Sequence, residues 1–415
     1  MTSRERVLSA LRFAEPDRVP LALGETVMSG IMAQALDRLR RYLGLASRRV
    51  RVYEVFQMLG EVEADLVERL GIDTLPVEPP ELFFGLRREN YRPWRLWDGT
   101  EVLMPGQFQV EADAQGDLLL HQGGDAAKPV VAVMPRNGFY FDAFAARQAE
   151  TEFDPPAFAE VRAGSRLSPA DAEFLQARAE YLRRTTDKAL VLGCWGKLGL
   201  PWVGSIPDFL VLLATRPDYV RDLFKLRTEV ALENLETLQR HLGGKVDVVG
   251  LDGADFGTQR GELFAPGWFA DLFVPFFTAQ NRWVHANTAW KTWQHTCGSI
   301  TRLLPLLVES GLDILNPVQC SAAGMDPGWL KTTFGGRLVF WGGGVDTQRT
   351  LPFGTPAEVA AEVAERVRVF APGGGYVFNP IHNIQHGTPP ANIVAAYETA
   401  RRVGTYPILG GRSSA

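Results

Sequence analysis

The feature that most constrains this 415-residue chain is the alternation of short apolar runs with segments of helical periodicity. The runs are rich in β-branched or aliphatic residues and end in Gly, Asp, Asn or His, as buried strands do where they meet a loop. Between the runs, segments such as 217–244 and 355–375 have the period of amphipathic helices, the second with Thr355 as its N-cap. Strands alternating with helices are typical of βα units. The eight runs are 18–25, 71–77, 188–196, 245–253, 290–298, 312–319, 337–346 and 375–383.

Eight strands joined by helices predict an α/β fold of the (β/α)8 TIM-barrel type. Barrels of this kind often exceed ~250 residues as one unit, so we expect residues 1–407 to form a single domain and 408–415 a disordered tail. Residues 84–150 break the alternation, and their sequence, which is rich in aromatic and turn residues, predicts a small antiparallel β insertion after the second strand. Such an insertion either roofs the active site or forms a structural or homodimer-forming appendage, and the sequence leaves both alternatives open.

Composition and charge exclude several classes of function. The formal net charge is −5 and the basic residues are scattered, so the chain lacks the basic surface that nucleic acid requires. There is no run of 18 apolar residues, which excludes a membrane span. Three irregularly spaced cysteines do not make a disulfide framework, and the first twenty residues are too charged for a secretory signal. We therefore expect a cytoplasmic protein.

Polar side chains gather at the ends of the predicted strands, where barrel enzymes place their catalytic groups. Each one has a simpler explanation, because helix N-caps also favour Asp and Asn. Their convergence, rather than any single residue, favours an active site at this end of the barrel. The candidates are Glu25 after the first run, Asp252 and Asp255 after the fourth, His295 and Cys297 at the fifth, Asn316 and Gln319 at the sixth, Asp346 at the seventh, and Asn379, His382 and Asn383 at the eighth.

The pair His295 and Cys297 has the most specific chemistry of these candidates. Side chains two residues apart on a strand point to the same face, so both can reach one ion. Imidazole nitrogen and thiolate sulfur are standard zinc ligands. The same pair also occurs as ordinary core residues, so a metal site requires a third ligand. His382 is the better placed candidate, and Cys320, one residue beyond its strand, is the alternative.

Several separated motifs resemble the uroporphyrinogen decarboxylase superfamily and occur in the family's order. The resemblance runs from about residue 3 to 404, and its motifs lie at 4–24, 294–319 and 340–400. It implies a (β/α)8 barrel and one of two activities. One is cofactor-free decarboxylation of a tetrapyrrole, and the other is zinc-dependent transfer of methyl groups between corrinoid proteins and thiols or methylated substrates.

The charges at the first strand distinguish these two branches. The decarboxylases have an Arg-rich signature there, whereas this chain reads LALGETVMSG. His295 and Cys297 match the His-x-Cys pair of the methyltransferases, but His382 stands where those enzymes have a cysteine. The resemblance thus implies a zinc methyltransferase whose corrinoid is carried by a partner protein, since no Asp-x-His-x-x-Gly signature is present. One thiolate and two imidazoles make zinc a stronger Lewis acid, which favours an oxygen leaving group or a water over a thiol.

The resemblance also suggests roles for the other candidates. Asp252 and Asp255 resemble the family's acidic motif after the fourth strand and, with His382, are candidates for proton transfer; capping of the next turn is their alternative role. A metal-free decarboxylase or lyase acting on a small carboxylate is the alternative activity, and a barrel that binds a partner without catalysis is a third. The predicted substrate contacts are Glu25, Tyr53, Trp195, Asn316, Gln319, Asp346 and Asn383.

Overall fold

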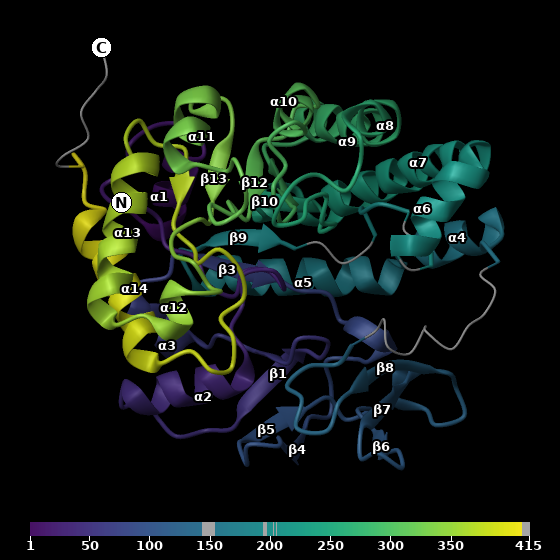
Figure 1. The fold of residues 1–415 in the computed structure, drawn as a ribbon, viewed down its shortest axis with the longest axis horizontal. Coiled ribbons are helices and arrows are strands. Elements are labelled where there is room, and N and C mark those ends of the chain that lie inside the picture. The colour runs from purple at the N-terminus through teal and green to yellow at the C-terminus, as the bar shows by residue number, and fades with distance from the viewer. Residues whose placement is uncertain (143–153, 194–196, 202, 205, 409–415) are drawn as a thin grey trace.

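The core of the fold is one parallel β-sheet covered by helices (Figure 1). The computed structural model describes residues 1–142, 154–193, 197–201, 203–204 and 206–408. The strand order is β14-β13-β12-β11-β10-β9-β3, so consecutive βα units lie side by side and the predicted parallel α/β sheet is confirmed. Its strands are β3 (Thr74–Val77), β9 (Ala189–Leu192), β10 (Val248–Asp252), β11 (Lys291–His295), β12 (Ile314–Asn316), β13 (Val339–Trp341) and β14 (Tyr376–Val377).

The first predicted strand, 18–25, is replaced by a shorter segment that joins the two edges of the sheet. Residues 20–22 exchange two backbone hydrogen bonds with Phe378, of 2.8 and 2.9 Å, and accept a third from the N–H of Asp73 at 2.8 Å. These bonds link the end of β14 to the start of β3 and close the sheet into a ring. A longer regular strand is disfavoured because Pro20 has no N–H to donate to a neighbour.

Apolar side chains fill the interior of this ring. The fully buried indoles of Trp293 and Trp341 are the largest of them and lie among aliphatic residues from the other strands. Helix α1 (Ser3–Ala10) closes the amino-terminal end, where Val7 and Leu11 belong to the same cluster. The polar residues at the carboxyl ends of the strands, opposite α1, therefore lie next to a closely packed apolar interior.

Helices with one apolar face cover the outside of the sheet. Helix α13 (Pro356–Phe370) has Thr355 as its N-cap, as predicted from the sequence, and the Thr355 side chain accepts from the N–H of Glu358 in a capping box. It buries Val359, Val363 and Val367 along one stripe. In the described part of the chain, no helix is long and apolar enough to cross a membrane. The other helices are α2 (Ala33–Tyr42), α3 (Ala64–Leu70), α4 (Phe158–Ser165), α5 (Pro169–Thr185), α6 (Ile206–Thr215), α7 (Pro217–Leu242), α8 (Pro266–Trp268), α9 (Val274–Asn287), α10 (Leu304–Glu309), α11 (Pro327–Phe334), α12 (Thr350–Phe353), α13 (Pro356–Phe370) and α14 (Pro390–Val403).

Two small sheets lie together at the side of the molecule opposite α8–α11 (Figure 1). One has the order β2-β1-β5-β4 and the other β6-β7-β8. The first sheet contains strands that precede β3, so this β-rich region draws on more of the chain than the predicted insertion at 84–150. Its separation as a subdomain stays a prediction, and nearly all of the predicted tail lies outside the described residues. The strands are β1 (Val50–Glu54), β2 (Leu59–Gly60), β4 (Arg92–Arg95), β5 (Glu101–Met104), β6 (Val110–Ala112), β7 (Leu118–His121) and β8 (Val130–Met134).

Candidate metal centre

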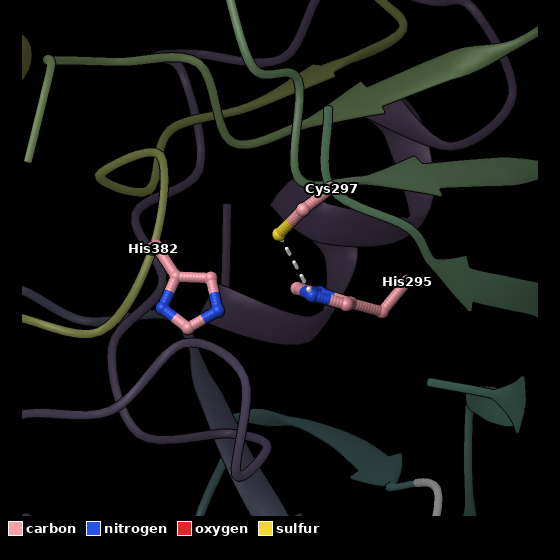
Figure 2. A group of neighbouring side chains, drawn as sticks. All are labelled: His295, Cys297 and His382. Carbon is pink, nitrogen blue, oxygen red and sulfur yellow. Dashed lines mark hydrogen bonds between the residues drawn. The ribbon is translucent and has the colours of Figure 1, made fainter. Parts of the chain in front are cut away.

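Two histidines and a cysteine meet at the carboxyl end of the sheet (Figure 2). His295 ends β11, Cys297 follows it by two residues, and His382 lies in the loop after β14. One ligand atom from each lies within 4.8 Å of the others. Cys297 Sγ is 3.3 Å from His295 Nε2, and the two imidazole centroids are 5.4 Å apart. The structure therefore brings together the three residues that the sequence predicts as metal ligands, and we call them the triad.

A buried chain of hydrogen bonds fixes the tautomer of His295. The Nδ2 group of Asn316 donates to the Trp341 carbonyl at 3.0 Å, which turns its Oδ1 atom toward the imidazole. The Nδ1–H group of His295 donates to that oxygen at 2.7 Å. The lone pair of His295 is consequently on Nε2, the atom that faces Cys297. Hydrogen-bonded partners of this kind orient metal-binding histidines.

The loop that carries Cys297 is held by close backbone packing. Gly298 has a φ of +91°, a backbone conformation that residues with a side chain rarely adopt. A Cβ atom there would also lie 2.3 Å from the carbonyl carbon of Gly257, so there is no space for a side chain. The Cys297 N–H donates to Asp255 Oδ1 at 2.8 Å. The same carboxylate oxygen is 3.7 Å from His295 Nε2. Asp255 is thus placed directly beside two members of the triad.

His382 reaches the triad from a loop that is tied to its neighbour. Two backbone hydrogen bonds, of 2.9 and 3.1 Å, join residues 379–381 to residues 344–345. Burial, reinforced by the neighbouring His295, lowers the pKa of His382 to about 4. Its imidazole is therefore neutral at physiological pH and has a lone pair to offer.

The donor set fits a zinc ion. Zinc takes imidazole and thiolate ligands, and a site with three protein ligands keeps one position open for a substrate. Burial and the nearby Asp255 raise the pKa of the Cys297 thiol well above its usual value. A divalent cation that binds there would displace the thiol proton, because only the thiolate ligates strongly.

A cavity of about 300 Å³ opens beside the triad. Its wall is made by loops that follow β10, β11, β12, β13 and β14, so it lies where barrel enzymes bind their substrates. Its side chains include three glutamines and two threonines beside Ile381 and two members of the triad. The described lining residues are Gly257, Thr258, Gln259, Cys297, Gly298, Gln319, Thr347, Gln348, Ile381 and His382.

Among the predicted substrate contacts on this side of the barrel, Gln319 lies in the cavity wall and two others do not. Asn316 orients His295, as described above, and is almost fully buried. Asp346 accepts the backbone N–H of Gln348 at 2.7 Å and so stabilises the loop that carries a wall residue. Neither is among the described residues that line the cavity.

The predicted contacts that lie in or against residues 24–30 are enclosed. Glu25 is fully buried, and its Oε1 atom accepts from Trp341 Nε1 at 2.9 Å. Burial raises the pKa of this carboxyl to about 7. Tyr53 and Asn383 both bond to the backbone of residues 26–30, at 3.2 and 2.5 Å respectively. None of the three is among the described residues that line the cavity.

The remaining candidates have different positions. Asp252 is buried, accepts the N–H of Leu200 at 3.1 Å, and has its pKa raised by burial to about 6; it fixes a neighbouring loop. The structure does not bring Cys320 to the triad, because its sulfur turns back to the carbonyl of Val318, at 3.4 Å. Trp195 lies outside the described residues.

Sequence reasoning missed most of the cavity wall. Thr258 and Gln259 follow β10, and Thr347 and Gln348 follow β13. In both loops a Thr-Gln pair comes shortly after an aspartate, at Asp255 and Asp346. That repeated pattern is the sequence signal for the cavity wall. It is weak, because uncharged Thr and Gln residues are common in loops and have less specific chemistry than acids and histidines.

Comparisons with known proteins agree with this architecture. Residues 203–403 match the model of the family described as uroporphyrinogen decarboxylase (URO-D). A solved structure of a methyltransferase from Methanosarcina mazei has a TM-score of 0.55 and 16% sequence identity, and the match covers 97% of this chain and 98% of that one. A search among curated proteins finds no match. The matched residues include the whole triad, so the half of the chain that carries the candidate metal centre is similar to the uroporphyrinogen decarboxylase family.

Proposed function

We propose that this chain is a zinc-dependent methyltransferase that moves a methyl group between a small methylated substrate or thiol and a corrinoid carried by a partner protein. The observation that carries the proposal is the triad, whose three ligand atoms lie within 4.8 Å of one another at the edge of a cavity. The similar fold of a protein named a methyltransferase supports the same reaction class.

The triad residues His295, Cys297 and His382 would hold the metal through Nε2 of the first, Sγ of the second and a ring nitrogen of the third. Bound zinc would supply a Lewis acid that polarises the atom from which the methyl group departs. The cavity wall would hold the substrate in line with the departing group. These roles need no movement of the triad, because Asn316 and Asp255 already fix two of its members.

Asp255 would handle the proton of the reaction. When a carbon–oxygen bond to the methyl group breaks, both electrons stay on the oxygen, which then takes up a proton, while the methyl group passes to the reduced corrinoid of the partner. The Asp255 side chain is half exposed and adjoins the triad, so it can exchange a proton between solvent and the reacting oxygen. The reverse transfer uses the same group in the opposite direction.

The size of the cavity bears on where the corrinoid would bind. About 300 Å³ is at the small end of ligand pockets and far below the volume of a corrinoid. We therefore place the corrinoid at the mouth of the cavity, on a separate protein. The alternative activity, decarboxylation of a small carboxylate, receives no support from the site, because the described lining contains no Arg or Lys to hold such a substrate.

Metal stripping and reconstitution test this proposal. The purified protein would be stripped of metal with a chelator and divided into three samples. One would be reloaded with zinc, one with magnesium, and one left stripped. Transfer of methyl groups from a panel of small ethers, thioethers and amines to free cob(I)alamin would be followed by its visible absorption. We expect transfer only in the zinc-loaded sample. Transfer at full rate in the stripped sample would refute the metal-dependent mechanism.

A further inference from the structure

The wall of the cavity contains three glutamine side chains and no ionised one among the described residues. Gln259 and Gln348 come from the loops after β10 and β13, and the Nε2 group of Gln259 donates to Gln348 Oε1 at 3.2 Å. This bond joins two loops across the cavity. One N–H of Gln259 and both N–H groups of Gln348 remain for other partners, since each amide nitrogen carries two.

Gln319 is the third glutamine, and its orientation is fixed. Its Oε1 atom accepts the backbone N–H of Gly298 at 2.6 Å, and an N–H group can bond only to the oxygen end of the amide. The side chain is 5% exposed and lines the cavity. In the part of the chain that the structure describes, no hydrogen bond satisfies its Nε2 group. Because Gln319 lines the cavity, this donor faces open space and can bond to an acceptor on a molecule bound there.

The charges around the cavity restrict that acceptor further. Asp255, beside the triad, disfavours an anion at this end, and no described lining residue is a lysine or arginine that would pair with one. A cation would lack the aromatic faces or carboxylates that usually bind it in the wall itself. A bound zinc ion, the Cys297 thiolate and the Asp255 carboxylate beside it sum to zero charge, so an ionised group that left water for this wall would lose its hydration without gaining a net counter-charge.

We infer that the cavity selects an uncharged methylated substrate and that the Gln319 amide donates to an oxygen acceptor of that substrate, close to its methyl group. That the substrate carries a methyl group rests on the proposed function. The inference adds the charge class of the substrate and the residue that determines it. Gln259 and Gln348 complete the neutral wall.

A matched pair of probes tests the charge class. The neutral 3-methoxypropionamide and the anionic 3-methoxypropionate have the same methyl ether and nearly the same shape, and their charge lies away from the ether oxygen. Binding of each to the zinc-loaded chain, without corrinoid, would be measured by ligand-observed NMR titration. We expect the amide to bind roughly tenfold tighter than the carboxylate. Equal binding, or tighter binding of the carboxylate, overturns the inference.

Substitution of Gln319 by Glu tests the donor with little change of shape. The Gln319→Glu variant keeps an oxygen for the N–H of Gly298 and replaces the donor by an acceptor. We expect binding of 3-methoxypropionamide to weaken roughly tenfold, the scale of one lost buried hydrogen bond. The exposed Gln115→Glu variant carries the same charge change and should bind as the wild type does. Unchanged affinity in Gln319→Glu, with zinc content and unfolding temperature equal to the control, contradicts the assignment.

A second variant reverses the expected preference. In Gln348→Lys a cation is added to the wall without a change in Gln319 or the triad, so binding should shift at least fivefold toward the carboxylate. A ratio that stays at the wild-type value would count against a neutral wall as the cause of selectivity. These binding results are independent of methyl transfer: selective binding without transfer would refute the proposed function alone, and transfer without selectivity would refute this inference alone.

Discussion

The two sides of the barrel mouth use polar residues in opposite ways. On the side formed by the loops after β10–β14, the triad presents ligand atoms to one point, and Gln319 presents a donor to an open cavity. On the side formed by residues 24–30 and β1, Tyr53 and Asn383 bond to loop backbone and Glu25 is sealed against Trp341. A polar residue at a strand end therefore indicates chemistry only when part of its bonding capacity is left unused next to a cavity.

The two cysteines near the mouth give the sharpest test of that difference. In Cys297→Ser the site loses its thiolate, and we expect the affinity for zinc to fall by roughly 10²- to 10³-fold, since each ligand supplies about 3–4 kcal/mol of a typical zinc binding free energy. Methyl transfer should fall with it. Cys320→Ser is the matched control and should bind zinc normally. Competition with a fluorescent zinc chelator measures both, and equal losses in the two variants would contradict the assignment.

Glu25 tests the enclosed side through the pH dependence of stability. Burial raises the pKa of Glu25 from its ordinary 4.5 to about 7, so the folded state keeps a proton that the unfolded chain has already lost. The contribution of this group to stability therefore falls as pH rises through that window and is constant above it.

The Gln substitution at Glu25 keeps an acceptor for Trp341 Nε1 and removes the titration. We expect Glu25→Gln to gain about 3 kcal/mol relative to the wild type between pH 4.5 and pH 8. Urea unfolding of both proteins at the two pH values measures this difference. Parallel pH dependence in the two proteins would show that Glu25 is not held as a buried, protonated acid.

Two buried asparagines distinguish support of the triad from support of the fold. Loss of the oxygen that orients His295, in Asn316→Ala, should reduce zinc affinity by roughly 10- to 100-fold. Asn281 is equally buried and bonds to Ser310 between two outer helices. Asn281→Ala should cost about 1–3 kcal/mol of stability and leave zinc affinity unchanged. Similar zinc affinities in the two variants would remove Asn316 from the site.

Much of the fold could be predicted from the sequence, because most of the seven buried strands are short runs of apolar residues that end in loop residues. The predicted strand at 18–25 is shorter in the structure because Pro20 lacks an N–H for pairing. The pattern of hydrophobic residues does not show this backbone property. The β-rich region extended beyond 84–150 because β1 pairs with β5, and pairing between distant segments has no local signature. Long-range register is therefore the part of the fold that one sequence specifies least visibly.

The site divides in the same way. His295, Cys297 and His382 could be predicted because their chemistry is rare in this chain and their strands end at one edge. Glu25, Asn316, Asp346 and Asn383 were expected to touch substrate, yet they bond to protein groups, and only coordinates reveal where a side chain's partners are. The residues of the cavity wall were missed because the role of an amide such as Gln259 or Gln348 depends on which loop it faces, and the sequence does not show that.

The central claim is that His295, Cys297 and His382 share one zinc ion, and elemental analysis of the purified chain tests it most directly. After exposure to zinc and removal of the excess, the wild type should hold about one zinc per chain, the number for a single site of this type. The His285→Ala variant, which alters a histidine paired with Asp313 away from the site, should hold the same amount. His382→Ala should lose most of it. A wild type without zinc, or a His382→Ala variant that retains a full equivalent, would contradict the account.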